Sequence, residues 1–213
     1  MEDKTLQLNN SNTKHNSKTN LLGLSKTELK LILVKNNLPK FRADQLWNWI
    51  YRSGTTNFDL MTNISKDLRA ILSNLFYIWR PKILASNKSE DGTIKWLLKL
   101  DDGNEIETVW IQDHERGTLC ISSQVGCTLT CKFCHTGTQR LVRNLTSSEI
   151  VGQVMLAMDE IKDWPSASEN RLLTSIVLMG MGEPLYNYEN VKNAIEIIMD
   201  HSGISLSKRR ITL

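Results

Sequence analysis

Apolar residues recur at helical spacing in three segments of the first third of the chain. The first segment follows a Ser-x-x-Glu capping box formed by Ser25 and Glu28, and it ends before Pro39. The second covers about residues 42–52, and the third follows Ser65. The pattern therefore predicts a small module of three helices.

Changes in composition mark the borders of this module. Residues 1–20 are rich in Asn, Ser, Thr and Lys and contain only two leucines. Because such a segment buries too little apolar surface to offset the entropy of ordering, we expect a disordered tail there. The helical module spans residues 21–80. Its Lys and Arg side chains could contact RNA phosphates, although charged residues on short helices more often form a solvated surface.

Residues 81–112 alternate apolar and polar side chains, and two Asp-Gly turn signals divide them into three strands. We expect a small antiparallel β meander that links the module to the rest of the chain. In its last strand, Glu107 shares a face with Glu105 and Val109. A carboxylate against an apolar surface suits proton transfer, whereas a glutamate on an edge strand more commonly faces water. Both possibilities stay open for Glu107.

Residues 113–213 alternate strands with helices. Residues 118–124 form the first predicted strand, and a second capping box, Thr146 with Glu149, opens the helix that follows. A continuous apolar run at residues 174–180 predicts the second strand, and a third begins at residue 209 after another helix. This order predicts right-handed crossovers and a parallel sheet with its functional loops at the carboxyl ends of the strands.

The composition is that of a globular chain of 213 residues with 40% hydrophobic residues and a net charge of +3. No stretch is long and apolar enough for a membrane span, and no apolar secretory signal is present, so we expect a cytoplasmic protein without a membrane partner. All four cysteines lie within residues 120–134, which favours metal ligation in a reducing compartment over a disulfide framework. The mild positive charge permits an RNA partner without requiring one.

Cys127, Cys131 and Cys134 follow a C-x3-C-x2-C spacing. Three thiolates can each ligate one iron of a [4Fe-4S] cluster and leave the fourth iron open for chemistry. A structural zinc ion would need a fourth ligand, which Cys120 or His135 could supply. The asymmetric spacing favours the cluster, and the zinc site remains the alternative.

A second candidate site is the glycine-rich turn Met179–Pro184, which follows the second parallel strand. Its glycines would let a ligand approach the backbone closely, and Glu183 adds a carboxylate that can bind an ammonium group. Alone, such a turn is weak support for a ligand site.

Taken together, these motifs resemble those of the radical S-adenosylmethionine (SAM) superfamily, and within it the RlmN family of adenine-C2 RNA methyltransferases. The resemblance covers about residues 21–213 and implies an α/β fold. In that fold a small helical domain and a short β meander precede the first part of a partial (βα)6 barrel. The motifs that carry it, in chain order, are residues 41–47, 107–111, 120–127, 131–134, 179–184 and 206–210.

For the cofactors, the resemblance implies that Cys127, Cys131 and Cys134 hold a [4Fe-4S] cluster whose open iron binds the amino and carboxylate groups of SAM. An electron from the cluster then cleaves SAM to give a deoxyadenosyl radical. Gly182 and Glu183 match the turn that contacts the methionyl end of SAM. An external electron donor such as flavodoxin is implied as a partner.

For the chemistry on RNA, the resemblance implies 23S rRNA and tRNA as substrates. Glu107 matches the proposed proton acceptor. Cys120 matches a cysteine outside the cluster that assists proton removal and resolves a protein–RNA adduct. The sister activity, methylation of adenine at C8, is a further alternative, as is a zinc-stabilised RNA-binding module.

The chain departs from the family pattern in one respect. The family carries a further, methyl-carrying cysteine far downstream, whereas no cysteine follows Cys134 here and the chain ends at Leu213, in the third barrel strand. We therefore expect residues 113–213 to be a truncated barrel. We also expect the chain alone not to complete methyl transfer, unless a second polypeptide supplies the missing half.

Overall fold

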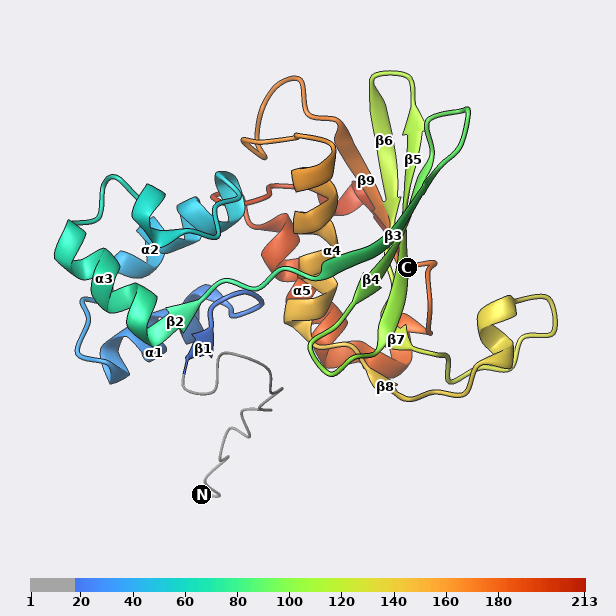
Figure 1. Cartoon of the computed structure of the whole chain (residues 1–213), viewed down its shortest axis with the longest axis horizontal. Coiled ribbons are helices and arrows are strands. Elements are labelled where there is room, and N and C mark those ends of the chain that lie inside the picture. Colours follow the sequence, from blue (N-terminus) through green and yellow to red (C-terminus); the bar gives the residue numbers. More distant parts are fainter. Residues whose placement is uncertain (1–17) are drawn as a thin grey trace.

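A six-stranded mixed sheet organises the part of the chain that the computed structural model describes, residues 18–213 (Figure 1). The strand order is β10-β9-β6-β5-β4-β3. Neighbours from β3 to β6 are antiparallel, whereas β6, β9 and β10 are parallel. The strands are β3 (Lys82–Lys88), β4 (Ile94–Lys99), β5 (Glu105–Asp113), β6 (Arg116–Cys120), β9 (Leu173–Val177) and β10 (Ile211–Thr212).

The predicted meander and the predicted parallel strands are both present, but they belong to one sheet. β5 pairs with β6 across a short turn, so that Trp110 lies opposite Leu119. The sequence treats the meander as a separate linker because periodicity shows that strands exist without showing which of them pair. The pairing places the face of the meander and the face of the parallel strands side by side.

Three predicted strands are shorter than expected. The strand predicted for residues 174–180 is β9, which ends at Val177. The strand predicted for residues 118–124 is β6, which ends at Cys120. The Ile121 N–H still donates to the Val177 carbonyl at 2.9 Å, and Gln153 then provides the hydrogen-bond partners of Ser122. The Ser122 N–H donates to Gln153 Oε1 at 2.8 Å, and Gln153 Nε2 donates to the Ser122 carbonyl at 3.0 Å. The last strand begins only after the 3-10 helix Lys208–Arg210. A separate two-stranded ladder follows β6, formed by β7 (Gln124–Val125) and β8 (Arg143–Asn144).

All predicted helices are present, and the second continues from its α-helical turns into a π-helical turn. The first three helices form the module on the left of Figure 1, while α4 and α5 lie between this module and the sheet. The helices are α1 (Lys26–Lys35), α2 (Arg42–Trp47), the π-helix η1 (Asn48–Arg52), α3 (Lys66–Leu75), α4 (Ser147–Glu160) and α5 (Tyr188–Met199).

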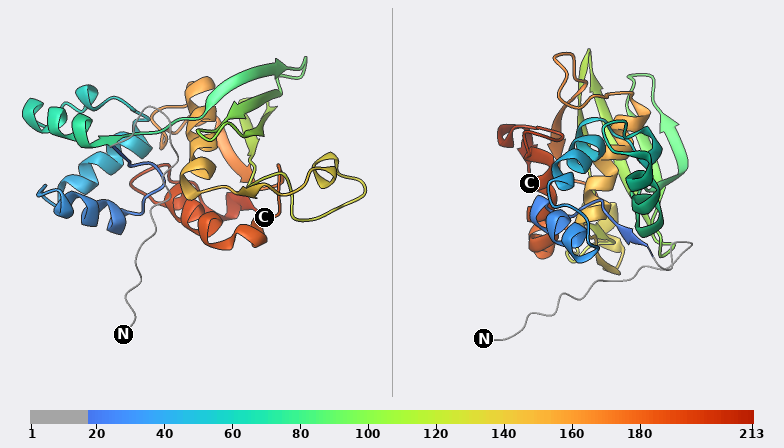
Figure 2. Two further views of the ribbon diagram at one scale, coloured as in Figure 1. Left: turned by 60° about the horizontal axis from the view of Figure 1, so that its bottom comes forward. Right: turned by 90° about the vertical axis from the view of Figure 1, so that its left-hand side faces the viewer.

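α4 is the central helix and is buried over most of its length, including Val154 and Met155. On the sheet side, the Thr108 hydroxyl donates to Gln153 Oε1 at 2.8 Å. On the module side, Asn20 Nδ2 donates to the Ser148 hydroxyl at 2.7 Å. The two views of Figure 2 agree that α4 stands between the module and the sheet. The apolar core therefore runs through α4 from one to the other.

The disordered tail predicted for residues 1–20 extends too far. Thr19–Asn20 form β1, which pairs in parallel with β2 (Phe76–Tyr77). Asn20 Oδ1 accepts hydrogen bonds from the backbone N–H groups of Leu22 and Trp79. Composition does not predict this ordered strand, because the two hydrogen bonds come from a single asparagine side chain. The remainder of the predicted tail, residues 1–17, lies outside the described residues.

Both predicted capping boxes are confirmed. At the start of α1, Ser25 Oγ accepts from the Glu28 N–H, and Glu28 Oε2 accepts from the Ser25 N–H at 2.7 Å. Thr146 and Glu149 make the same reciprocal pair at the start of α4. These boxes satisfy backbone donors that a helix leaves unpaired at its first turn.

Ser25→Ala is expected to lower the free energy of unfolding by about 1 kcal/mol, because the Glu28 N–H loses its acceptor. Ser65→Ala is the matched control, since Ser65 precedes α3 without a side-chain capping bond. Chemical denaturation of the two variants measures the difference. Equal destabilisation by both substitutions would contradict the role of the capping box.

Between residues 18 and 213, no helix is long and apolar enough to cross a membrane. The cytoplasmic location stays a prediction from the sequence.

Candidate active site

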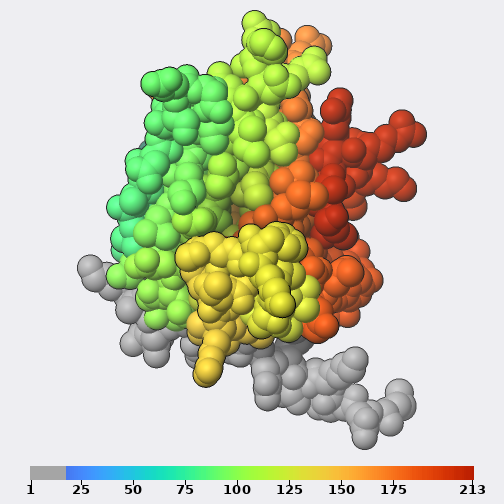
Figure 3. All heavy atoms as spheres, turned by 90° about the vertical axis from the view of Figure 1, so that its right-hand side faces the viewer, coloured from blue at the N-terminus to red at the C-terminus, as the bar shows by residue number. Residues whose placement is uncertain are grey.

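The three closely spaced cysteines lie on one loop, residues 126–142, that joins β7 to β8. This cysteine loop, yellow in the ribbon views, extends from the body of the molecule (Figures 1 and 2) and faces the viewer in Figure 3. At its base, Gly126 has φ +75°, and a Cβ there would overlap the carbonyl of Arg140. The backbones of Cys127 and Arg140 form a β-bridge. Glycine therefore allows the two arms of the loop to approach each other.

The donor set on this loop fits an iron–sulfur cluster. Cys127, Cys131 and Cys134 are free and partly exposed. The Leu129 N–H donates to Cys127 Sγ at 3.3 Å, and hydrogen bonds from the backbone of Gly137, and then Thr136, lower the pKa of the Cys134 thiol. The lowered pKa of Cys134 favours its thiolate, which is the form that ligates metal.

The sulfurs are not preassembled around a metal position. Among residues 18–213, no group of three or more Cys, His, Asp or Glu side chains has a geometry that could hold a metal ion. Cys120 lies on β6 rather than on the loop. A fourth cysteine ligand from the same loop is therefore not part of the structure.

Glu107 and Cys120 lie on the same face of the sheet, opposite the face that packs on α4. The register pairs Glu107 with Leu97, Val109 with Cys120, and Cys120 with Val177, and residues paired in this way share a face. Burial raises the pKa of the Cys120 thiol. The two predicted proton-transfer residues are thus brought to one surface.

The surroundings of Glu107 differ from both predicted environments. Its carboxylate forms an ion pair with Lys95 Nζ at 2.9 Å, and both side chains are about half exposed. β5 lies between β4 and β6, so Glu107 is not on an edge strand. The face around this carboxylate is mixed, because β4 contributes Leu97 opposite Glu107 and also the lysine that pairs with it.

A cavity of about 320 Å³ joins the three parts of the candidate site. It lies where Glu107, the cysteine loop and the glycine-rich turn meet. Cys120, the three loop cysteines, Gly182 and Glu183 lie outside its lining. The lining residues are Leu97, Glu105 and Glu107 from the sheet, His135, Thr136 and Gln139 from the loop, and Met181 from the turn.

The glycine-rich turn packs against the protein itself. Gly182 has φ +95°, and a Cβ at this position would overlap the Gln124 side chain. Gln124 therefore fills the space beside Gly182, and the approach of a ligand to this turn stays a prediction. The Glu183 carboxylate accepts from the Leu185 N–H at 3.2 Å, which caps the short 3-10 helix Pro184–Asn187. Glu183 is partly exposed at the surface.

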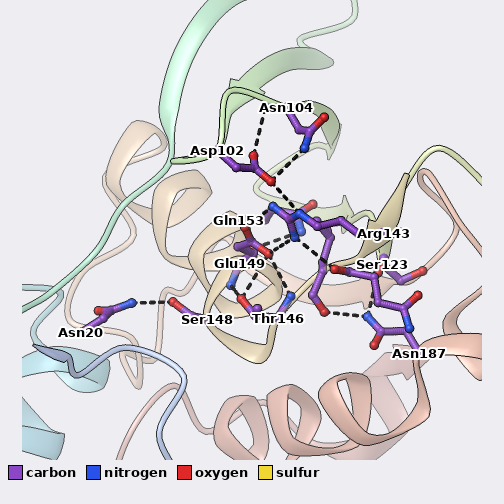
Figure 4. A network of polar contacts seen from close by, with 12 residues as sticks. Asn20, Asp102, Asn104, Ser123, Arg143, Thr146, Ser148, Glu149, Gln153 and Asn187 are labelled. Atoms are coloured by element: carbon purple, nitrogen blue, oxygen red, sulfur yellow. Dashed lines mark hydrogen bonds and ion pairs between the residues drawn. The ribbon is translucent and has the colours of Figure 1, made fainter. Parts of the chain in front are cut away.

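Arg143, which the sequence does not single out, anchors the end of the cysteine loop (Figure 4). Its guanidinium bonds both carboxylate oxygens of Glu149 at 2.8 Å and Asp102 Oδ2 at 2.6 Å. The hydrogen bond with Glu149, and then that with Asp102, raise the pKa of Arg143. Nearby, Asn187 Nδ2 donates to the Ser123 carbonyl at 2.8 Å. Asp102 lies 41 residues from Arg143, and Ser123 lies 64 residues from Asn187, so no local pattern predicts these two contacts.

Iodoacetamide is expected to modify Cys134 before Cys120 near neutral pH. The lowered pKa of Cys134 gives more thiolate at a given pH, whereas burial of Cys120 raises its pKa and restricts access. As pH rises, Cys134 should therefore reach its full reactivity first. Peptide mass spectrometry over a time course measures both rates, and equal rates would show that backbone hydrogen bonds and burial do not control the thiols.

Comparison with known proteins finds a matching family model and similar RNA methyltransferases. Residues 19–78 match the family model of the ribosomal RNA large subunit methyltransferase N-terminal domain. The chain is 57% identical over 197 residues to the dual-specificity RNA methyltransferase RlmN of Rhizorhabdus wittichii, a match that covers 91% of this chain and 49% of the relative. The match to the same enzyme of Zymomonas mobilis is 54% over 205 residues, covering 94% and 52%.

A solved structure shows the same fold. The crystal structure of a radical SAM methyltransferase from Sphaerobacter thermophilus matches with a TM-score of 0.81 and 38% identity, over 91% of this chain and 55% of that one. The chain thus spans about half the length of the curated relatives that it matches.

Proposed function

Because this chain belongs to the RlmN family, we propose that it contributes the cluster-binding half of a radical SAM enzyme that methylates C2 of adenine in RNA. The observation that best supports this is the cavity of about 320 Å³ between Glu107, the cysteine loop and the glycine-rich turn. It places a carboxylate beside the two segments that would hold the cofactors.

In this proposal Cys127, Cys131 and Cys134 hold a [4Fe-4S] cluster, in line with their free, partly exposed thiols on one loop. When bound, the cluster supplies the electron that cleaves SAM. Gly182 and Glu183 bind the methionyl end of SAM, for which the partly exposed carboxylate of Glu183 suits an ammonium group.

Two residues on the open face of the sheet would act on the adenine. Glu107 accepts a proton at its carboxylate, and the ion pair with Lys95 keeps that carboxylate oriented in the cavity. Cys120 assists proton removal and resolves a protein–RNA adduct. Burial, which raises the pKa of its thiol, is compatible with a proton-carrying rather than a metal-ligating sulfur.

The proposed substrates are 23S rRNA and tRNA, and an external donor such as flavodoxin would supply electrons in the cytoplasm. With a reductant and SAM present, mass spectrometry of the digested RNA would distinguish methylation at C2 from methylation at C8.

Anaerobic reconstitution with iron and sulfide tests the proposal. We expect about four irons and about four sulfides per chain, with a brown colour and visible charge-transfer absorbance. A parallel sample receives zinc alone. Colourless protein that holds zinc and fails to retain iron would overturn the proposal in favour of a zinc-stabilised RNA-binding module.

A further inference from the structure

Gln124 is a fully buried amide at the base of the cysteine loop. Its Nε2 donates to Thr128 Oγ1 at 2.9 Å and to Asn144 Oδ1 at 2.8 Å. Its Oε1 accepts from the Thr128 N–H at 3.2 Å and from the Glu183 N–H at 3.0 Å. One side chain therefore contacts the start of the loop, the strand at its end and the glycine-rich turn.

We propose that Gln124 is a positioning residue that holds the cysteine loop and the glycine-rich turn in fixed register with each other. Thr128 directly follows Cys127, and Glu183 lies in the turn, so the amide links a candidate cluster ligand to a candidate SAM contact. The inference rests on the proposed function only for what these two segments bind. The link itself is a property of the chain without cofactors.

The backbone explains why this one side chain carries the link. The turn is tied to the segment before the loop, because the Gly180 N–H donates to the Ile121 carbonyl and the Gln124 N–H donates to the Met181 carbonyl. Among the hydrogen bonds of residues 18–213, the Gln124 side chain alone extends this connection to Thr128. Without the Gln124 side chain, the cysteine loop and the glycine-rich turn would each keep their local contacts but would lose the one side chain that bonds to both.

The chemistry of the amide also suits the role. A glutamine can donate two hydrogen bonds while its oxygen accepts others, and all of these are used here. Asparagine is one methylene shorter and methionine lacks both donors and acceptor oxygen. The absence of a Cβ at Gly182 leaves the space in which the Gln124 side chain lies.

Amide hydrogen exchange in the full 213-residue chain, without iron or SAM, tests the proposal. In Gln124→Met, exchange at the Thr128 and Glu183 N–H groups is expected to rise together by about tenfold, since both lose the same acceptor. Gln124→Glu keeps the acceptor oxygens and should retain more protection at both sites than Gln124→Met. Gln124→Asn, which keeps an amide in the site but cannot reach both partners, provides a second variant if Gln124→Met does not fold.

Gln153→Met is the matched control, because Gln153 is also a fully buried glutamine with several hydrogen bonds but contacts Thr108 and Ser122 instead. It should lower overall stability without raising exchange selectively at Thr128 and Glu183. The proposal is overturned if only one of the two amides responds in the Gln124 variants, or if Gln153→Met gives the same paired response. Neither outcome depends on cluster assembly, so failure here is distinct from failure of the proposed function.

Discussion

Cys127→Ala, Cys131→Ala and Cys134→Ala are each expected to abolish retention of a [4Fe-4S] cluster after anaerobic reconstitution. Each thiolate would ligate a different iron, so removal of one leaves a second iron without a protein ligand. The three sulfurs share one loop and are all free. Iron and sulfide analysis, together with visible absorbance, measures the loss.

Cys120→Ala is the matched control for these three substitutions. Its thiol lies on β6, on the face of the sheet that carries Glu107, and not on the loop. Iron content should therefore equal that of the unmodified chain. Loss of metal in Cys120→Ala to the same extent as in the loop variants would indicate a four-cysteine site, as in a structural zinc centre.

Gly182→Ala is expected to lower the free energy of unfolding by about 2–4 kcal/mol. The alanine must adopt φ +95°, and its Cβ must also displace the Gln124 side chain. Gly103→Ala is the control, since Gly103 has φ +88° but no atom within 4 Å of an added Cβ. It should cost only about 1 kcal/mol for the backbone conformation. Denaturant unfolding of both variants gives the two values.

The difference between these two substitutions isolates the contact with Gln124. Similar losses at Gly103 and Gly182 would mean that the Gln124 side chain moves aside at little cost. That result would contradict tight packing between the glycine-rich turn and the base of the cysteine loop.

Local signals predicted the helices well. The Ser25–Glu28 and Thr146–Glu149 capping boxes are confirmed because each depends on side chains only three residues apart. Alternation predicts that the strands exist but not which strands pair, so the sequence does not show that β5 pairs with β6. The early end of β6 was missed for a related reason, since Gln153 reaches it from a helix 31 residues away.

The candidate site was predicted in part. Spacing singled out the cysteines that share one loop, and alternation put Glu107 on one face of its strand with Glu105 and Val109 without showing which face is apolar. The ion pair with Lys95 could not be predicted, because it depends on the register between β4 and β5. The same holds for Arg143, whose partners Asp102 and Glu149 lie on two other segments. Residues that position a site are harder to predict than residues that carry its chemistry, because their partners are distant in the sequence.

The central position of α4 has a consequence for biosynthesis. The helical module and the meander leave the ribosome before α4, which begins at Ser147. Until then Trp79, which is buried in the folded chain and packs against Gly152 of α4, lacks this contact. We expect nascent chains that end before α4 to be sensitive to proteases and to bind chaperones. Protection of the chain from proteases should appear once residue 160 has left the ribosome. The two halves of the fold would then become stable in a single late step of synthesis.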